Sequence, residues 1–90
     1  MNEIAESAMV TAEMYGGEVY HVRYTRGYKT DIANITEGNV YVSNDSSFEG
    51  KHIIIPPECG YNGLKLDGRQ DLYIKPETAG KITLVRHGFI

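Results

Sequence analysis

The stretch that decides the fold reads TDIANIT (residues 30–36), EGN (37–39), VYVS (40–43) and NDSS (44–47). Two runs that alternate apolar with other residues are separated by one turn signal and followed by a second. Strands place successive side chains on opposite faces, so this alternation between turns is typical of short strands. The same spacing continues to the end of the chain. The sequence therefore predicts an all-β fold, a small antiparallel β-sandwich or barrel of seven to eight short strands.

The first residues fit two patterns. Ile4 and Met9 lie on one face of a possible helix, whereas the run that begins at Val10 alternates as a strand does. We expect residues 1–9 to form a loose or briefly helical N-terminal arm. Residues 10–90 are then a single β-sandwich domain, since ninety residues suffice for one domain and one modest core.

One set of apolar residues shares the expected inward face of the strands. Alternation assigns each of them to the core, and we predict that they are mostly buried. They are Val22, Ile35, Val40, Val42, Ile53, Ile55, Leu64, Leu66, Leu72, Ile74, Ile82 and Leu84.

The charge balance and the lengths of the apolar runs argue against two classes of partner. Nine basic and twelve acidic residues give a net charge of −3, and the basic residues form no stripe. We expect no nucleic-acid partner, because such proteins carry a basic patch. No apolar run reaches the length of a membrane span, so we expect no membrane partner.

A single cysteine, Cys59, fits synthesis in a reducing cytoplasm, and we expect it to be partly buried beside a turn.

The residues that carry chemistry are scattered. His21, His52 and His87 fall on three separate predicted strands, whereas zinc ligands usually come in close pairs. No Gly-x-Ser-x-Gly elbow supports a nucleophilic serine. No glycine-rich turn precedes a helix, as a phosphate-binding loop requires. We therefore expect no enzyme activity, no catalytic residue, no metal site and no cofactor.

The aromatic content is unusual and has more than one interpretation. The chain has seven tyrosines, two phenylalanines and no tryptophan. The simplest interpretation is that Tyr20, Tyr24, Tyr41 and Tyr73 lie on half-buried strand faces. Tyrosine also combines apolar area with a hydroxyl group and is enriched at protein interfaces and at sugar-binding surfaces. The candidate interface residues are Tyr15 and Tyr61, together with Ile4 and Met9 of the N-terminal segment.

The sequence also resembles a group of small bacteriophage virion proteins. The resemblance covers about residues 30–88 and rests on three features: the stretch TDIANITEGNVYVS, the step IIIPPE (residues 53–58), and the strands LYI (72–74) and KITLVR (81–86). Members of that group are capsid decoration proteins, head-fibre bases and tail accessories. They are β-sandwiches or barrels that assemble as oligomers and carry no catalytic or ligand residue.

This resemblance implies a function. It indicates a non-enzymatic virion protein, most simply a capsid decoration protein that docks on the shell as a homo-oligomer. A trimer is favoured, with the major capsid or tail protein as partner and the virion as location. Two alternatives remain open from the residues: a β-sandwich recognition module that binds a glycan or a peptide through its loops, and a small phage-encoded inhibitor of a host protein.

Overall fold

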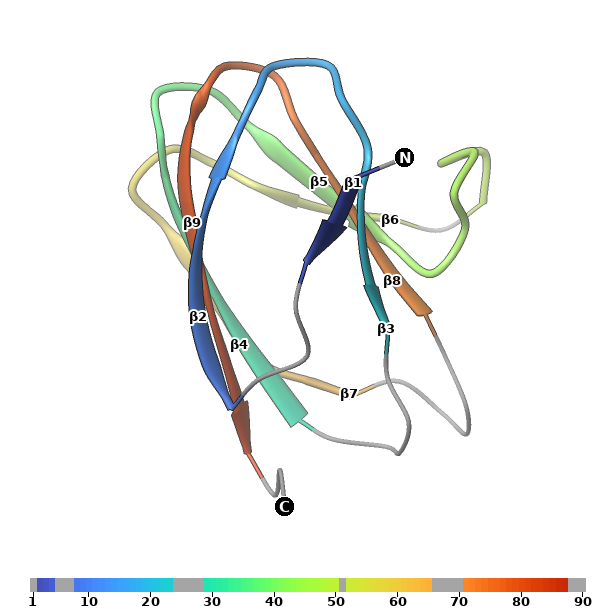
Figure 1. Ribbon diagram of the computed structural model, residues 1–90, viewed down its shortest axis with the longest axis vertical. Coiled ribbons are helices and arrows are strands. Elements are labelled where there is room, and N and C mark those ends of the chain that lie inside the picture. The colour runs from blue at the N-terminus through green and yellow to red at the C-terminus, as the bar shows by residue number, and fades with distance from the viewer. Residues whose placement is uncertain (1, 5–7, 24–28, 51, 66–70, 88–90) are drawn as a thin grey trace.

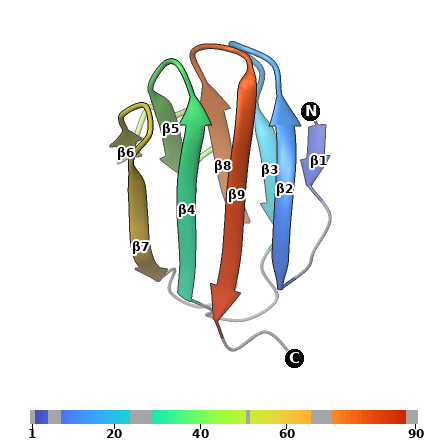
Figure 2. The same cartoon turned by 90° about the vertical axis from the view of Figure 1, so that its left-hand side faces the viewer.

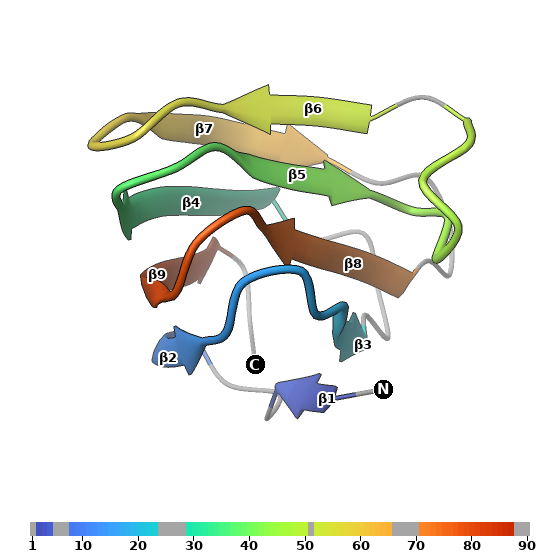
Figure 3. The same cartoon turned by 90° about the horizontal axis from the view of Figure 1, so that it is seen from above.

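The computed structural model describes residues 2–4, 8–23, 29–50, 52–65 and 71–87. These residues form two sheets that pack face to face (Figures 1 and 3). The first sheet has the order β1 (Asn2–Ile4), β3 (Tyr20–Arg23), β8 (Asp71–Pro76), β5 (Val40–Ser43), β6 (His52–Ile55). The second has the order β2 (Met9–Met14), β9 (Gly80–His87), β4 (Lys29–Thr36), β7 (Gly60–Lys65). The predicted all-β sandwich is confirmed, with nine strands in the described residues in place of the expected seven or eight.

The strand order defines a jelly roll. From β2 to β9 the chain forms the quartets β2-β9-β4-β7 and β3-β8-β5-β6, and all pairings within them are antiparallel. Figure 2 shows the quartet β2-β9-β4-β7 face-on with the other quartet behind it. Double Greek-key connections of this kind make two sheets of four strands. The extra strand, β1, pairs in parallel with β3 at one edge.

The core lies between the sheets and follows most of the predicted alternation. Eight of the predicted residues are buried: Val22, Val40, Val42, Ile55, Leu72, Ile74, Ile82 and Leu84. Ile53 and Leu64 are half-buried, and Leu66 lies outside the described residues. Ile4, Met14, Tyr20 and Ile32 join the core although the sequence analysis did not include them.

The prediction for Ile35 is wrong, because β4 turns its other face inward. Ile35 is 58% exposed, whereas Asn34 is 1% exposed and Thr36 is 3% exposed. The Asn34 side-chain amide donates to the carbonyl oxygens of Gly38, Ile55 and Pro56, at 2.9, 2.9 and 3.1 Å. A buried polar group is tolerated when its hydrogen bonds are made. Asn34 therefore points into the core, and Ile35, which the alternation pattern assigned to the core, points to solvent.

The N-terminal segment also differs from expectation. Residues 2–4 form strand β1 in place of a loose or helical arm, and Ile4, opposite Val22, is 8% exposed within the core cluster. The second strand begins at Met9, one residue before the expected start. Residues 2–4 therefore belong to the sandwich, and the Ile4 side chain is not available as an interface residue.

Candidate functional site

Two hollows lie at one corner of the sandwich, around the start of β6. The inner hollow lies between the sheets and is lined by Val42, Ser43, Asn44, Gly50, His52, Ile53, Leu64 and Leu72. The outer hollow lies on the outward face of the five-stranded sheet and is lined by Tyr41, Phe48, His52 and Lys75. His52 contributes to both, and the loop of residues 44–50 contributes to both rims.

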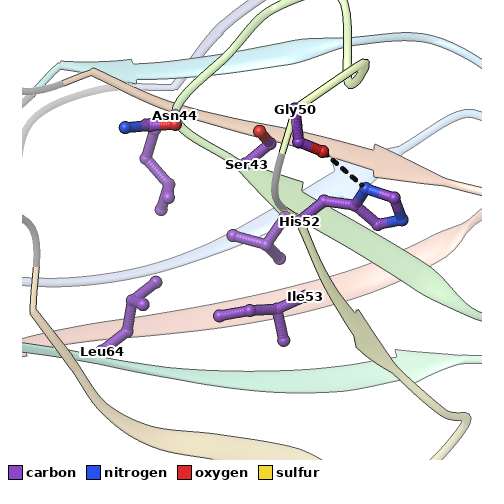
Figure 4. Close-up of a pocket in the computed structure, with 8 residues that line it drawn as sticks. Ser43, Asn44, Gly50, His52, Ile53 and Leu64 are labelled. Atoms are coloured by element: carbon purple, nitrogen blue, oxygen red, sulfur yellow. Dashed lines mark hydrogen bonds between the residues drawn. The ribbon is translucent and has the colours of Figure 1, made fainter.

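The inner hollow has a volume of about 620 Å³ and a mainly aliphatic lining. Ile53 lies near the start of β6 and Leu64 near the end of β7. Both side chains are half-buried, because they point inward and line this open hollow. Figure 4 shows the imidazole of His52 directed away from Leu64 and toward Gly50, whose carbonyl oxygen lies 3.3 Å from Nδ1. A hollow of this size, apolar inside with polar groups at its rim, has the character of a binding site.

The loop of residues 44–50 is held by one aspartate. The Asp45 carboxylate accepts hydrogen bonds from the Ser47 N–H at 3.0 Å and from the Ser47 hydroxyl at 2.9 Å. These bonds lower the pKa of Asp45 below its ordinary range. The Phe48 N–H donates to the Asp45 carbonyl at 3.0 Å, and Phe48 adopts a φ of 59°. A left-handed backbone is unusual for a bulky residue, so this loop fixes the Phe48 ring at the outer hollow against its local preference.

The outer hollow gathers three rings and one ammonium group in a volume of about 220 Å³. Tyr41 lies opposite Lys75 in the β5–β8 ladder, and its ring meets that of His52 edge-on at 5.9 Å. The Tyr41 hydroxyl donates to the Glu77 carboxylate at 2.5 Å, and the Asn39 N–H donates to the same carboxylate at 3.0 Å. This arrangement raises the pKa of Tyr41 and lowers the pKa of Glu77.

The three histidines are not brought together. His21 is buried on the outward side of β3: Nδ1 contacts the Glu3 carboxylate at 2.5 Å, and its ring stacks on Tyr73 at 5.0 Å. Nε2 lies 3.0 Å from Asp71, an ion-pair distance without hydrogen-bond alignment.

On the other sheet, His87 contacts Asp31 at 2.7 Å, which lowers the pKa of Asp31. No group of three metal-ligating side chains occurs among the described residues.

The predicted interface residues do not form one patch. Met9 and Tyr15 are 66% and 69% exposed at the two ends of β2, and Tyr61 is 40% exposed on β7. Strands β2 and β7 are the opposite edges of the four-stranded sheet. No pattern in the sequence marks Phe48 or Lys75 as a site residue, and His52 stands out there only as one of three histidines that could bind a metal. The polar run NDSS before Phe48 signals a turn, but its geometry depends on the hydrogen bonds of Asp45.

Cys59 is exposed, in contrast to the expected partial burial. It follows the Pro56–Pro57 turn, where the chain crosses from one sheet to the other. Among the described residues there is no helix long and apolar enough to cross a membrane.

The comparisons with known proteins support the fold. No family model matches the chain, and no curated protein matches it. Among solved structures the chain is similar to the crystal structure of PirA, with 15% sequence identity and a TM-score of 0.65. That likeness covers 93% of this chain and 97% of the other. At this identity it shows a shared jelly-roll architecture and carries no function across.

Proposed function

We propose that this protein is a recognition module that binds an extended peptide segment of a protein partner, without catalysis. The partner strand pairs with the free edge of β6 and places an apolar side chain in the inner hollow. The observation that supports this role is the 620 Å³ hollow, which carries aliphatic side chains inside and polar groups at its rim.

The edge of β6 supports a strand as the occupant. β6 pairs with β5 on one side, and none of the described strands pairs with its other side. An added strand satisfies exposed backbone groups of an edge and places alternate side chains on the same face as its neighbour. A side chain opposite Ile53 would therefore point inward, into the mouth of the hollow. Ile54, which is 50% exposed, points to the other face.

Peptide display tests this proposal. Random peptides are selected on the immobilised protein, and enriched sequences are synthesised and measured by fluorescence polarisation. We expect peptides with alternating apolar residues, which lose at least about tenfold in affinity when one backbone N–H is methylated. Failure to enrich any such peptide, or indifference of binding to N-methylation, contradicts the proposal.

A pair of variants locates the peptide. Ile53→Trp fills the hollow and should weaken binding by about tenfold or more, whereas Ile54→Trp changes the same strand on its outward face and should leave affinity nearly unchanged. Amide NMR spectra of both variants check that the fold persists. Equal affinities for the two folded variants would place the peptide elsewhere.

A second candidate function is a homo-oligomeric virion accessory protein, in line with the resemblance described above. The outward face of the four-stranded sheet favours it. Met9 lies beside Val85, and Ile35 lies across from Lys81, while the small side chains of Thr83 and Ala33 lie opposite each other between these two pairs. Exposed apolar residues on the face of a sheet suit contact between copies.

Light scattering at high micromolar concentration tests this second function, followed by co-sedimentation with virions. We expect an oligomer, with a trimer favoured, that dissociates when Met9→Lys and Ile35→Lys are combined. A monomer that also fails to sediment with virions contradicts the virion role and leaves the peptide module standing.

A further inference from the structure

The outer hollow lies on the opposite side of β6 from the inner one and is not used by the proposed peptide. From its geometry we propose that it is a separate binding site for an acidic saccharide, a sugar ring that carries a carboxylate. Three features support such a ligand: the rings that form the walls, the charge of Lys75 and the acceptor groups in and beside the hollow.

The three rings supply the apolar part of the site. Tyr41 and Phe48 are half-buried and His52 is exposed, so each presents ring surface to the hollow. Aromatic side chains carry large apolar area at small entropic cost, and they suit the C–H faces of a sugar ring. The left-handed backbone at Phe48 shows that its position is imposed by the loop rather than by local preference. Strain of this kind is concentrated at functional positions.

The positive charge of Lys75 favours a negatively charged ligand. Lys75 forms no ion pair with any described residue, although it lies in the ladder directly opposite Tyr41. An ammonium group in the wall disfavours a cationic ligand, which aromatic rings would otherwise attract. It favours a carboxylate, with which it forms a charge-assisted hydrogen bond.

Acceptor groups in and beside the hollow distinguish a sugar from a simple anion. Glu77 does not line the hollow, but its carboxylate accepts from the Tyr41 hydroxyl and is ionised, because the hydrogen bonds from Tyr41 and Asn39 lower its pKa. The charge of Glu77 repels a multiply charged anion more strongly than a singly charged one, and hydroxyl groups can donate to its carboxylate. In the neutral tautomer of His52 that donates through Nδ1 to the Gly50 carbonyl oxygen, Nε2 is an acceptor as well. The hollow therefore combines one cation with several acceptors, which suits a ring with one carboxylate and several hydroxyls.

NMR titration tests the site, with amide spectra recorded as sodium glucuronate is added to the whole protein. We expect saturable shifts at Tyr41, His52 and Lys75 with a Kd of about 1 mM, as is reasonable for one small ring. Methyl glucoside, sodium acetate and sodium benzoate are the comparison ligands. Each should bind at least about tenfold more weakly than glucuronate, since each lacks the carboxylate, the ring or the hydroxyls.

Variants separate this site from general effects of charge. Lys75→Gln should reduce glucuronate affinity by about tenfold or more, whereas Lys81→Gln, on the outward face of the other sheet, should not change it. Phe48→Tyr keeps the ring and should retain binding, and Phe48→Ala should lose it. Equal binding of benzoate, or glucuronate affinity that is unchanged in folded Lys75→Gln protein, would overturn the proposal.

Discussion

The two ends of β6 differ in what lies between the sheets. At its C-terminal end the carbonyl oxygens of Ile55 and Pro56 accept hydrogen bonds from the buried amide of Asn34, which belongs to the opposite sheet. At its N-terminal end, His52 and Ile53 border the 620 Å³ inner hollow. One end is closed by a satisfied polar network, and the other end is open and mainly aliphatic.

The difference indicates how a small sandwich can keep an open corner. Hydrogen bonds from Asn34 tie β4 to the β6–β7 connection, and the backbone adds two more: the Asn34 N–H donates to the Cys59 carbonyl at 2.9 Å, and the Glu58 N–H donates to the Asn34 carbonyl at 3.0 Å. A directional link of this kind fixes the spacing of the sheets. The other end of β6 then does not need a filled core to hold the sheets together.

The closed end should be the more sensitive to substitution. Asn34→Ala leaves the carbonyls of Gly38, Ile55 and Pro56 without this donor, and it removes the acceptor of the Thr36 hydroxyl. Because each buried group without a partner costs about 1–3 kcal/mol, we expect a loss of roughly 4 kcal/mol in the free energy of unfolding. Urea denaturation measures it, with exposed Asn62→Ala as the control. Similar stabilities of the two variants would refute the role given to Asn34.

Truncation of a side chain should cost more stability in the centre of the core than at the open corner. Leu84→Ala removes a side chain that is 1% exposed, and a cavity of that kind costs about 3 kcal/mol. Leu64→Ala truncates a half-buried side chain at the hollow and should cost about 1 kcal/mol, because solvent already reaches the site. Thermal melts of the pair give the comparison. Equal losses would mean that the corner is packed like the core.

Substitutions on the two faces of β4 should differ in stability by a smaller amount. Ile35→Thr replaces an exposed side chain, so stability should change by no more than about 0.5 kcal/mol. Ile32→Thr, on the inward face of the same strand, places a hydroxyl in the core and should cost about 2 kcal/mol or more. Chemical denaturation of both variants distinguishes the two faces, and a reversed order would restore the original assignment of Ile35.

The smallest effect concerns the exposed pair at the outer hollow. The hydrogen bond to Glu77 raises the pKa of Tyr41, so Glu77→Gln should lower it toward the ordinary value of about 10. Carbon NMR of the Tyr41 Cζ measures the change, with Glu13→Gln, on an exposed position of the other sheet, as the control. An unchanged pKa of Tyr41 would show that the bond is not formed in solution.

The pH dependence of this contact follows from the directions of the two shifts. The lowered pKa of Glu77 gives a contribution that is present above about pH 4 and is lost as the pH falls through the lowered value. The raised pKa of Tyr41 gives one that is present below about pH 10 and is lost as the pH rises through the raised value. The contact is therefore complete at neutral pH.

The sequence predicted the strands better than it predicted the polar interior. Alternation placed Val40, Val42, Ile82 and Leu84 correctly, because aliphatic side chains occupy the successive inward positions of these two runs. It failed at Ile35, where the inward positions of β4 are held by Asn34 and Thr36. It also failed at Ile4, because three residues are too few to show a period and the parallel pairing with β3 is not local.

The binding corner could be predicted only in part. The polar residues 44–47 predicted a turn and the apolar run 53–55 predicted a strand, so two of the segments that line the inner hollow could be recognised in the sequence. That Ile53 and Leu64 lie on either side of one hollow could not be predicted, because they belong to different sheets and the jelly-roll topology brings them together. The same holds for Tyr41, Phe48 and Lys75, which come from two strands and a loop with an unusual backbone.

By itself the sequence determined the architecture: period-2 runs between turn signals require short strands, and strands with one apolar face require a second sheet to cover them. Only the tertiary structure decided which face of β4 is buried, that residues 2–4 complete a sheet, and that one corner carries two hollows. These outcomes depend on hydrogen bonds and contacts between residues far apart in the chain, such as Asn34 with Pro56 and Tyr41 with Glu77. Periodicity along a chain carries no information about such pairs, since it records which face a residue takes and not what that face meets.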